Sequence, residues 1–161
     1  MDLYGTWIKY DAHNCPLPSD AFIDGLAASQ DGLIWATVHR QETVIDDNRR
    51  TERGWMDGIL QFDHDNWTWI PWGRTRLPQV MFQRRVVCDS AGNLWLSSAK
   101  SVCRYDGQTT ELFNGGENGL PDGPVFPCKL TPGRDNSMWL AMRLRGIYFF
   151  NDKGWQKFTI D

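Results

Sequence analysis

The sequence predicts an all-β protein assembled from three copies of a four-stranded unit. Its 161 residues include nine tryptophans beside fifteen glycines and eight prolines. Large flat side chains separated by turn formers are typical of many short strands, and Gly or Pro interrupts nearly every window in which a helix would need a continuous apolar stripe. Apolar residues make up 41% of the chain, which is enough for a core in one domain of this length. The remaining observation is an internal repeat.

The clearest repeated element is a polar turn that leads into a strand carrying an aliphatic residue and a tryptophan. An aspartate in each turn supports the unusual backbone angles that a tight turn needs, and the strand then packs its tryptophan. The tryptophans at equivalent positions are Trp35, Trp95 and Trp139, and we expect all three to pack between neighbouring units. Trp95 and Trp139 are 44 residues apart, whereas Trp35 and Trp95 are 60 apart.

Two more strand-like elements follow each tryptophan strand, and one precedes it. The first follower ends in an aromatic residue and then Asp or Asn, which opens a tight turn. A Leu-Pro pair introduces each unit, and a further β-like run, for example 85–88, lies between that pair and the aspartate turn. Each unit is therefore expected to hold four strands, a to d from inside to outside. Strands c lie at 58–63, 101–106 and 146–151, and strands d at 67–70, 110–113 and 155–158.

This pattern divides the chain into a single outer strand and three units. The segment 5–10 resembles a d strand without its own a, b and c strands, so an amino-terminal outer strand is expected within residues 1–16. The units span 17–76, 77–119 and 120–161. The first contains about sixteen extra residues in a b–c insertion over 38–57.

Four strands in a repeat of this length are typical of a β-propeller blade. The units resemble the two-component regulator propeller repeat, and the resemblance covers nearly the whole chain outside the insertion. It implies a bacterial sensor domain built from blades, and it indicates no reaction. The second unit carries the best match, at Asp89, Gly92, Leu94, Trp95, Leu96, Arg104, Tyr105, Asp106 and Gly107, followed by Asn118, Gly119, Leu120 and Pro121.

Three blades are too few to close a ring, because propellers usually have four to eight. An open wedge would expose two apolar blade faces, each on the order of several hundred Å², which monomers rarely do. Two copies related by a twofold axis would form a six-bladed ring. We therefore expect a homodimer, in which the amino-terminal strand crosses to the neighbour or adds a fifth strand at an edge. The alternative is that the chain is part of a longer propeller.

Candidate binding residues lie first in the b–c insertion, because loops often carry function on rigid scaffolds. Its arginines and a tryptophan are candidates for holding an anionic or carbohydrate ligand over the channel, and Trp72 is another aromatic residue outside the repeat pattern. The insertion is equally interpreted as an extended hairpin with solvated charges, or as a dimer contact. Basic residues of the innermost strands are expected to line the channel, either as an anion site or as plain solvated lining. The insertion and aromatic candidates are Arg40, Arg49, Arg50, Arg53, Trp55 and Trp72, and the channel candidates are Arg84, Arg85 and Lys129.

Charge and motif content exclude several classes of function. The net charge of −3 gives no broad basic field for nucleic acid. The sequence contains no run of about 18 apolar residues, so it predicts no membrane-spanning helix. The amino terminus lacks signal-peptide features, which favours a cytoplasmic location, with the periplasm expected instead if the chain is a fragment of a sensor. No histidine pair has metal-ligand spacing, and no catalytic triad or phosphate loop is recognisable, so no metal or cofactor is expected. The four cysteines are expected to be mostly buried free thiols.

The sequence thus predicts a non-catalytic β-propeller module that self-associates and binds a small ligand or a protein partner, as a sensor domain does. Two alternatives remain open. One is a pure assembly scaffold without a ligand, and the other is a propeller hydrolase or lyase with a site at the channel mouth.

Overall fold

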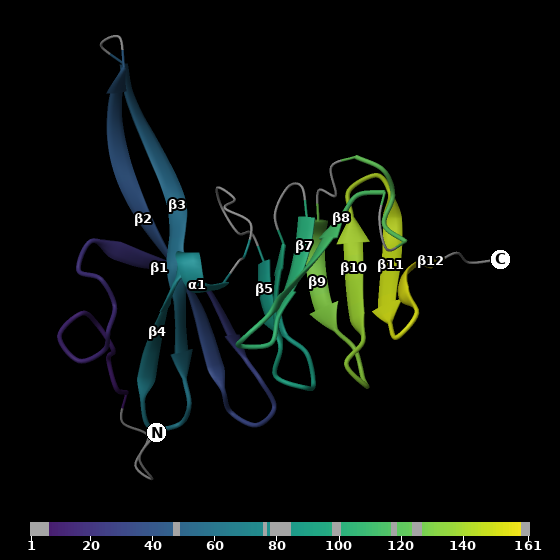
Figure 1. Cartoon of the computed structure of the whole chain (residues 1–161), viewed down its shortest axis with the longest axis horizontal. Coiled ribbons are helices and arrows are strands. Elements are labelled where there is room, and N and C mark those ends of the chain that lie inside the picture. Colours follow the sequence, from purple (N-terminus) through teal and green to yellow (C-terminus); the bar gives the residue numbers. More distant parts are fainter. Residues whose placement is uncertain are drawn as a thin grey trace.

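The computed structural model describes residues 7–46, 49–75, 77, 85–97, 101–116, 119–123 and 127–158, with the backbone alone for 41–46, 49–57, 85, 127 and 128. This part of the chain is all-β apart from one short helix (Figure 1). Its twelve strands form three antiparallel sheets of four strands. The predicted all-β fold with three four-stranded units is therefore confirmed, and the three sheets are consistent with propeller blades, so we call them blades 1, 2 and 3.

Each sheet is a meander in which strands that are consecutive in the chain are neighbours in space. Blade 1 holds β1 (Ala21–Ala28), β2 (Ile34–Asp46), β3 (Arg49–Phe62) and β4 (Trp67–Pro71), and helix α1 (Trp72–Thr75) follows it. Blade 2 holds β5 (Arg85–Cys88), β6 (Leu94–Ser97), β7 (Ser101–Tyr105) and β8 (Thr110–Asn114). Blade 3 holds β9 (Pro127–Pro132), β10 (Met138–Met142), β11 (Gly146–Asn151) and β12 (Gly154–Phe158).

The first strands of the blades lie side by side, so they are the innermost ones. β1 contacts β5, and β5 contacts β9. The two blades approach closely at Gly25 of β1, where a Cβ atom would lie 2.5 Å from Val86 Cγ2. A residue without a side chain is therefore needed for blades 1 and 2 to come this close.

The three blades share one strand register. Trp35 lies opposite Gln61, Trp95 opposite Arg104 and Trp139 opposite Phe149. Because alternate residues of a strand point to opposite faces of the sheet, each blade has two distinct faces. We call the face toward the next blade in the chain the forward face, and the other the backward face. The three repeat tryptophans all lie on forward faces.

The aspartate turn of blade 2 fixes the start of its tryptophan strand. The buried carboxylate of Asp89 accepts hydrogen bonds from the backbone amides of Ala91 (3.0 Å) and Asn93 (2.9 Å), from Asn93 Nδ2 (2.9 Å) and from Trp95 Nε1 (2.8 Å). Gly92 has a φ of 81°, a left-handed conformation that glycine adopts at little cost. The expected turn chemistry is thus present, and it ties the turn directly to the core.

Two apolar layers join the blades. The layer between blades 1 and 2 contains Trp35, Ile59 and Leu96, and the layer between blades 2 and 3 is dominated by aromatic rings. In the second layer the Trp95 ring lies 5.7 Å from Phe113, 5.1 Å from Phe150 and 6.0 Å from Trp155. We call Trp95, Phe113, Phe150 and Trp155 the aromatic quartet.

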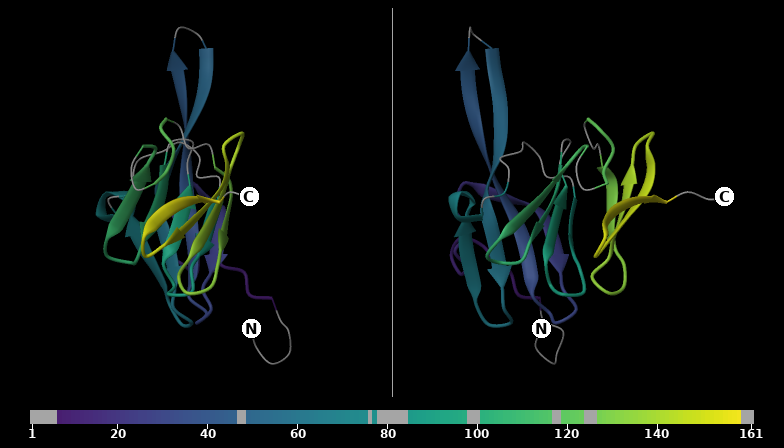
Figure 2. Two further views of the ribbon diagram at one scale, coloured as in Figure 1. Left: turned by 90° about the vertical axis from the view of Figure 1, so that its right-hand side faces the viewer. Right: turned by 45° about the vertical axis from the view of Figure 1, so that its right-hand side comes forward.

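The b–c insertion is an extended hairpin rather than an irregular loop. β2 and β3 are 13 and 14 residues long, whereas the other strands have at most eight. Their outer halves project beyond the ends of all other strands, as seen from several sides (Figures 1 and 2). The hairpin interpretation of the insertion is therefore confirmed.

The expected amino-terminal strand is not formed in the described residues 7–10, and residues 1–6 lie outside the described part. Residues 7–10 have no strand pairing, and a turn follows them. A strand needs an open sheet edge beside it. Residues 7–10 instead pack the ring of Tyr10 against Phe62 and Trp67 of blade 1, and blade 3 lies at the far end of the chain from this segment (Figure 1).

Candidate functional site

The forward face of blade 3 has no neighbouring blade within the described part of the chain. Ile147 and Phe158 are 47% and 50% exposed there, and Trp139 is partly exposed, although Trp35 and Trp95 at the equivalent positions are fully buried. Trp139 lies 4.7 Å from Phe149 and 5.6 Å from Phe158 between ring centres. Within the described part of the chain, Trp35 and Trp95 pack between blades as expected, whereas Trp139 has no neighbouring blade against it.

A cavity of about 500 Å³ adjoins this open face. Its lining combines the rings of Trp139 and Phe149 with polar groups of the two turns at the same end of the blade. These polar residues are Arg134, Asp135, Ser137, Asn151 and Asp152. Aromatic faces beside hydrogen-bonding side chains are suited to contacts with a partner surface or a polar ligand.

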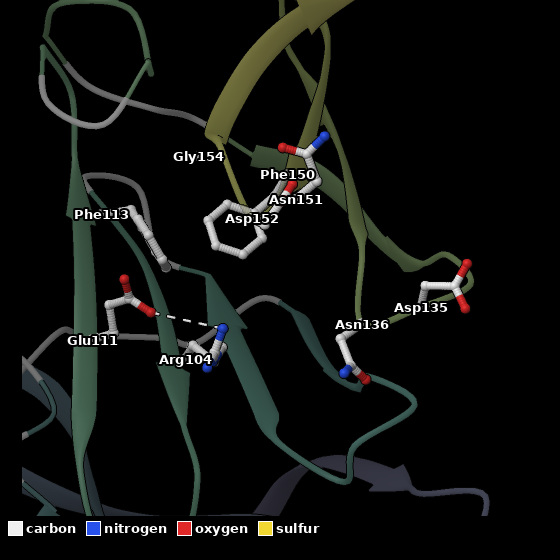
Figure 3. A pocket seen from close by; sticks show the side chains of 9 residues that line it. All are labelled: Arg104, Glu111, Phe113, Asp135, Asn136, Phe150, Asn151, Asp152 and Gly154. Carbon is white, nitrogen blue, oxygen red and sulfur yellow. Dashed lines mark ion pairs between the residues drawn. The ribbon is translucent and has the colours of Figure 1, made fainter.

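A second cavity, of about 470 Å³, lies between blades 2 and 3 (Figure 3). Arg104 of β7 lies 3.8 Å from the carboxylate of Glu111 on β8, and its guanidinium is 6.0 Å from the centre of the Trp95 ring. Asp135 and Asp152 also line it. The lining thus holds three carboxylates and one arginine, which favours a polyhydroxylated or cationic group over an anion.

Neither cavity was predicted from the sequence, because the polar residues that line them belong to strands and turns of the ordinary repeat. Asp135 lies in the turn before β10 and Asp152 in the turn before β12. In a four-stranded meander the a–b and c–d turns lie at the same end of the blade. This topology was the one feature from which the proximity of Asp135 and Asp152 could have been predicted.

The backward face of blade 1 is the other open face, and the amino-terminal segment covers part of it. Ala36, Val38 and Leu60 form a small buried cluster there, with Trp67 and Trp69 packed against it. The ring of Tyr10 lies 5.8 Å from Phe62 and 5.4 Å from Trp67. Tyr10 itself remains 41% exposed, so the cover is partial.

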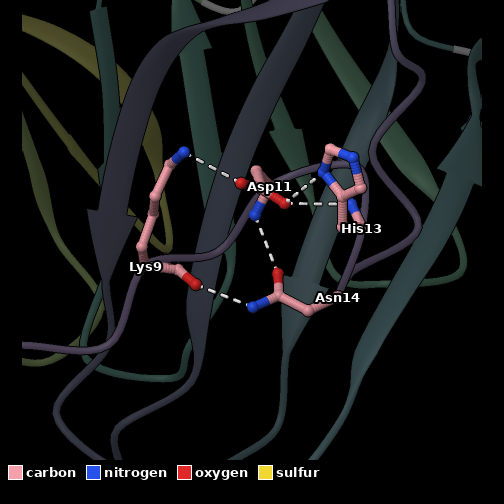
Figure 4. Close-up of polar contacts among 4 residues, drawn as sticks. All are labelled: Lys9, Asp11, His13 and Asn14. Atoms are coloured by element: carbon pink, nitrogen blue, oxygen red, sulfur yellow. Dashed lines mark hydrogen bonds and ion pairs between the residues drawn. The ribbon is translucent and has the colours of Figure 1, made fainter.

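A hydrogen-bonded turn holds Tyr10 in place (Figure 4). The carboxylate of Asp11 lies 2.9 Å from Lys9 Nζ and accepts a hydrogen bond from the backbone amide of His13 at 2.9 Å. The Asn14 side chain donates to the carbonyl oxygen of Lys9 at 2.7 Å and accepts from the backbone amide of Asp11 at 2.8 Å. The hydrogen bond with Lys9, followed by those with His13, lowers the pKa of Asp11 well below its usual value.

The structure brings some of the predicted insertion residues together in the projecting hairpin. Arg40 lies directly opposite Trp55, and its Nε is 3.6 Å from an oxygen of Asp20. The other three arginines have the cross-strand neighbours Asp46 for Arg49, Ile45 for Arg50 and Glu42 for Arg53. Two of these three arginines therefore lie opposite an acidic residue, and the hairpin carries both charges.

The remaining predicted residues lie elsewhere. Trp72 begins helix α1 and packs against the layer between blades 1 and 2, so it does not join the hairpin residues. Lys129 is exposed on the innermost strand β9, opposite Ala141. Arg85 begins the innermost strand β5, opposite Ser97, and Arg84 lies outside the described residues.

His39 is a buried titratable residue at the base of the hairpin. Its Nε2 lies 3.3 Å from Asp24 Oδ2, and its ring is stacked 5.7 Å from Phe22. Burial lowers the pKa of His39 below its ordinary value near 6.5, and the negative charge of Asp24 partly offsets this. The folded chain therefore favours the neutral imidazole.

We expect His39 to make stability fall in mildly acidic solution. Since its pKa is lower in the folded state, the unfolded chain binds the proton more readily, and the free energy of unfolding decreases as the pH falls below about 6.5 toward the folded-state pKa. Urea unfolding at several pH values should show this slope in the natural chain and a flatter one for His39→Gln. His64→Asn, at an exposed turn position, is the control. An identical slope for His39→Gln would contradict the assignment.

The described residues contain no group of three or more His, Cys, Asp or Glu side chains placed to bind a metal ion. Within the same part of the chain, no helix is long and apolar enough to cross a membrane. Cys15, Cys88 and Cys103 are free thiols, and burial raises the pKa of Cys88 and Cys103 to about 12. These two thiols therefore stay protonated, as expected of core residues. The side chain of Cys128 lies outside the described part.

The fold and site were compared with known proteins. No protein-family model matches the sequence, and no curated protein matches it. Among solved structures, the chain is similar to the extracellular domain assigned to a one component system of B. thetaiotaomicron, with 17% sequence identity and a TM-score of 0.46. The match covers 90% of this chain and 23% of that chain, so this chain spans less than a quarter of its length.

Proposed function

We propose that the chain is a non-catalytic β-propeller module that self-associates into a ring and binds a ligand in the manner of a sensor domain. The observation that carries the first half is the forward face of blade 3. Trp139 and its aromatic neighbours form an inter-blade surface of the same kind as that of blade 2, yet no blade within the described residues covers it. A second copy of the chain supplies the missing blade.

The energetics favour such an assembly. Complete burial of one large apolar side chain stabilises by about 1.5–3 kcal/mol. A ring of two chains contains two interfaces, and each interface covers one forward face of blade 3 and one backward face of blade 1. Many such side chains are therefore buried in one dimer. Association costs about 4–15 kcal/mol in lost freedom of movement. The apolar residues of both faces are sufficient in number to exceed that cost.

We expect the purified chain to have about twice its mass of 18.6 kDa in solution at tens of micromolar. Trp139→Ser should shift it to the monomer, because the substitution removes the centre of the open face. Leu144→Asn is the control, since Leu144 is 97% exposed in a turn outside that face. Light scattering after gel filtration gives the masses. A folded monomer for the natural chain at every concentration up to millimolar would contradict self-association.

The projecting hairpin is the proposed ligand site. A two-stranded hairpin is marginally stable in water unless something packs against it. Arg40 lies opposite Trp55 in the strand register near its base, and arginine and tryptophan are residue types that bind anionic groups and sugars. The ligand class proposed here is therefore a small anionic or carbohydrate molecule.

An array of glycans and anionic metabolites tests the ligand site. Binding should be lost in Trp55→Ala and retained in Trp7→Ala, because Trp7 is an exposed tryptophan outside the hairpin. The measurement is the equilibrium signal for each variant against the natural chain. Equal losses in both variants, or no binding by the natural chain, would contradict the ligand half of the proposal and favour a pure scaffold.

A further inference from the structure

The aromatic quartet shows how two blades of this protein join. Blade 2 contributes Trp95 and Phe113 from its forward face, and blade 3 contributes Phe150 and Trp155 from its backward face. The rings contact one another across the layer, with Phe113 5.1 Å from Phe150 and 5.9 Å from Trp155. Within each half, Trp95 and Phe113 are 5.7 Å apart, and Phe150 and Trp155 are 5.2 Å apart.

Each open face carries an aromatic pair equivalent to one half of the aromatic quartet, at the same positions in the strand register. Phe158 lies opposite Ile147 as Phe113 lies opposite Val102, so Trp139 and Phe158 repeat the half on blade 2. Phe62 lies opposite Trp67 as Phe150 lies opposite Trp155, so these two repeat the half on blade 3. Both halves have their internal contacts already, at 5.6 Å for Trp139 and Phe158 and 4.9 Å for Phe62 and Trp67.

Four aromatic residues are not a requirement of every layer. Between blades 1 and 2, the same positions hold Trp35, Ile70, Tyr105 and Thr110, of which Trp35 and Tyr105 lie 5.9 Å apart. That layer forms with two aromatic residues. The presence of all four on the open faces is therefore a specific indication of what covers them, namely each other.

Tyr10 occupies the position that the second copy needs. Its ring contacts both Phe62 (5.8 Å) and Trp67 (5.4 Å), the two residues equivalent to the Phe150 and Trp155 that Phe113 contacts. The segment carrying it, Trp7-Ile8-Lys9-Tyr10, has the pattern of Trp155-Gln156-Lys157-Phe158, with Tyr10 at the position of Phe158. In the unassociated chain, Tyr10 thus occupies the position that Phe158 of a second copy would take.

We infer that the forward face of blade 3 binds the backward face of blade 1 in a second copy, rebuilding the aromatic quartet, and that Tyr10 competes for the same surface. The inference rests on the proposed self-association and adds to it which faces pair and what limits the pairing. Unlike faces join, so each chain gives one face of each kind. Binding of the second copy displaces Tyr10 from Phe62 and Trp67. The hydrogen-bonded turn at Asp11 determines how much free energy this displacement costs.

A complementation experiment tests the pairing. Trp139→Arg disables the forward face of blade 3, and Trp67→Arg disables the backward face of blade 1. In each variant alone, both layers of the ring contain one arginine, so each should be monomeric. An equimolar mixture retains one intact layer per pair of chains, so it should form a dimer, measured by sedimentation equilibrium.

The outcomes separate the inference from the proposed function. Recovery of the dimer in the mixture supports the pairing and shows that both variants are folded. A dimer for Trp67→Arg alone, or a monomeric mixture beside a dimeric natural chain, overturns it while leaving self-association intact. A natural chain that stays monomeric up to millimolar concentration contradicts the proposed function itself.

The role of Tyr10 has its own test. Tyr10→Ser should lower the dissociation constant of the dimer about tenfold, because two aromatic contacts no longer compete. Asp11→Ala should act in the same direction, since it releases the turn without touching either face. Trp7→Ser is the control. A dissociation constant that is unchanged or higher in Tyr10→Ser overturns the competition.

Discussion

Trp95→Ala is expected to lower the free energy of unfolding by about 3–5 kcal/mol, the usual cost of removing a fully buried large aromatic side chain. The Trp95 ring is at the centre of the aromatic quartet and contacts both blades 2 and 3. Its indole nitrogen also donates to the buried Asp89 at 2.8 Å. The substitution thus leaves a cavity between the blades and removes one partner of Asp89.

The comparison with Trp139→Ala makes this prediction specific. Trp139 has the same position in its blade but lies on an open face, so its loss should cost about 1 kcal/mol or less in the free chain. Urea unfolding followed by far-ultraviolet circular dichroism, at a concentration low enough to keep the chain monomeric, measures both. Equal losses for the two variants would mean that Trp139 is buried in the single chain.

Asp89→Ala is expected to have a comparable effect, about 3–5 kcal/mol, since an unsatisfied buried donor costs about 1–3 kcal/mol. Its carboxylate accepts from two backbone amides, the Asn93 side chain and Trp95. Removal leaves all four donors without this partner at the start of β6. The turn and the tryptophan strand should therefore lose their common anchor.

Asp31→Ala is the matched control for this prediction. Asp31 lies in the corresponding turn of blade 1, but at the position of Ala91, because Ser29 holds the position of Asp89. Asp31 is exposed, and its carboxylate accepts a hydrogen bond from Ser29 that lowers its pKa. We expect a much smaller loss there, because interactions of exposed charges are screened by water. Thermal unfolding by calorimetry compares the two variants. A loss as small for Asp89→Ala as for Asp31→Ala would show that the indole and amide donors find other acceptors.

The repeat predicted the blades because local chemistry and strand period agree in this sequence. The c elements expected at 101–106 and 146–151 correspond to β7 and β11, and the a element at 85–88 corresponds to β5. Aspartate and glycine at the turns fix where strands begin, independently of the rest of the chain. The segment 5–10 has the same local pattern, yet residues 7–10 form no strand, because pairing depends on a sheet edge that a sequence pattern does not supply.

The candidate sites were less predictable for a related reason. Arg40 and Trp55 were selected as parts of one insertion, and their direct opposition depends on the hairpin register. The cavity residues Asp135 and Asp152 belong to separate turns that meet through the meander topology. The repeat pattern in the sequence already made Phe62 equivalent to Phe150. The strand pairing was needed to show on which face of the sheet each ring lies.

The close contact at Gly25 has a consequence for how copies assemble. In the proposed pairing unlike faces join, so each added chain would offer a new free face, and growth would stop only when the last face meets the first. Two chains close a circle when the three blades of one chain turn through half of it, about 60° per blade. The missing side chain at Gly25 keeps β1 against β5 and so helps to set that angle. A bulkier residue there would splay the blades and turn a closed pair into an open fibre.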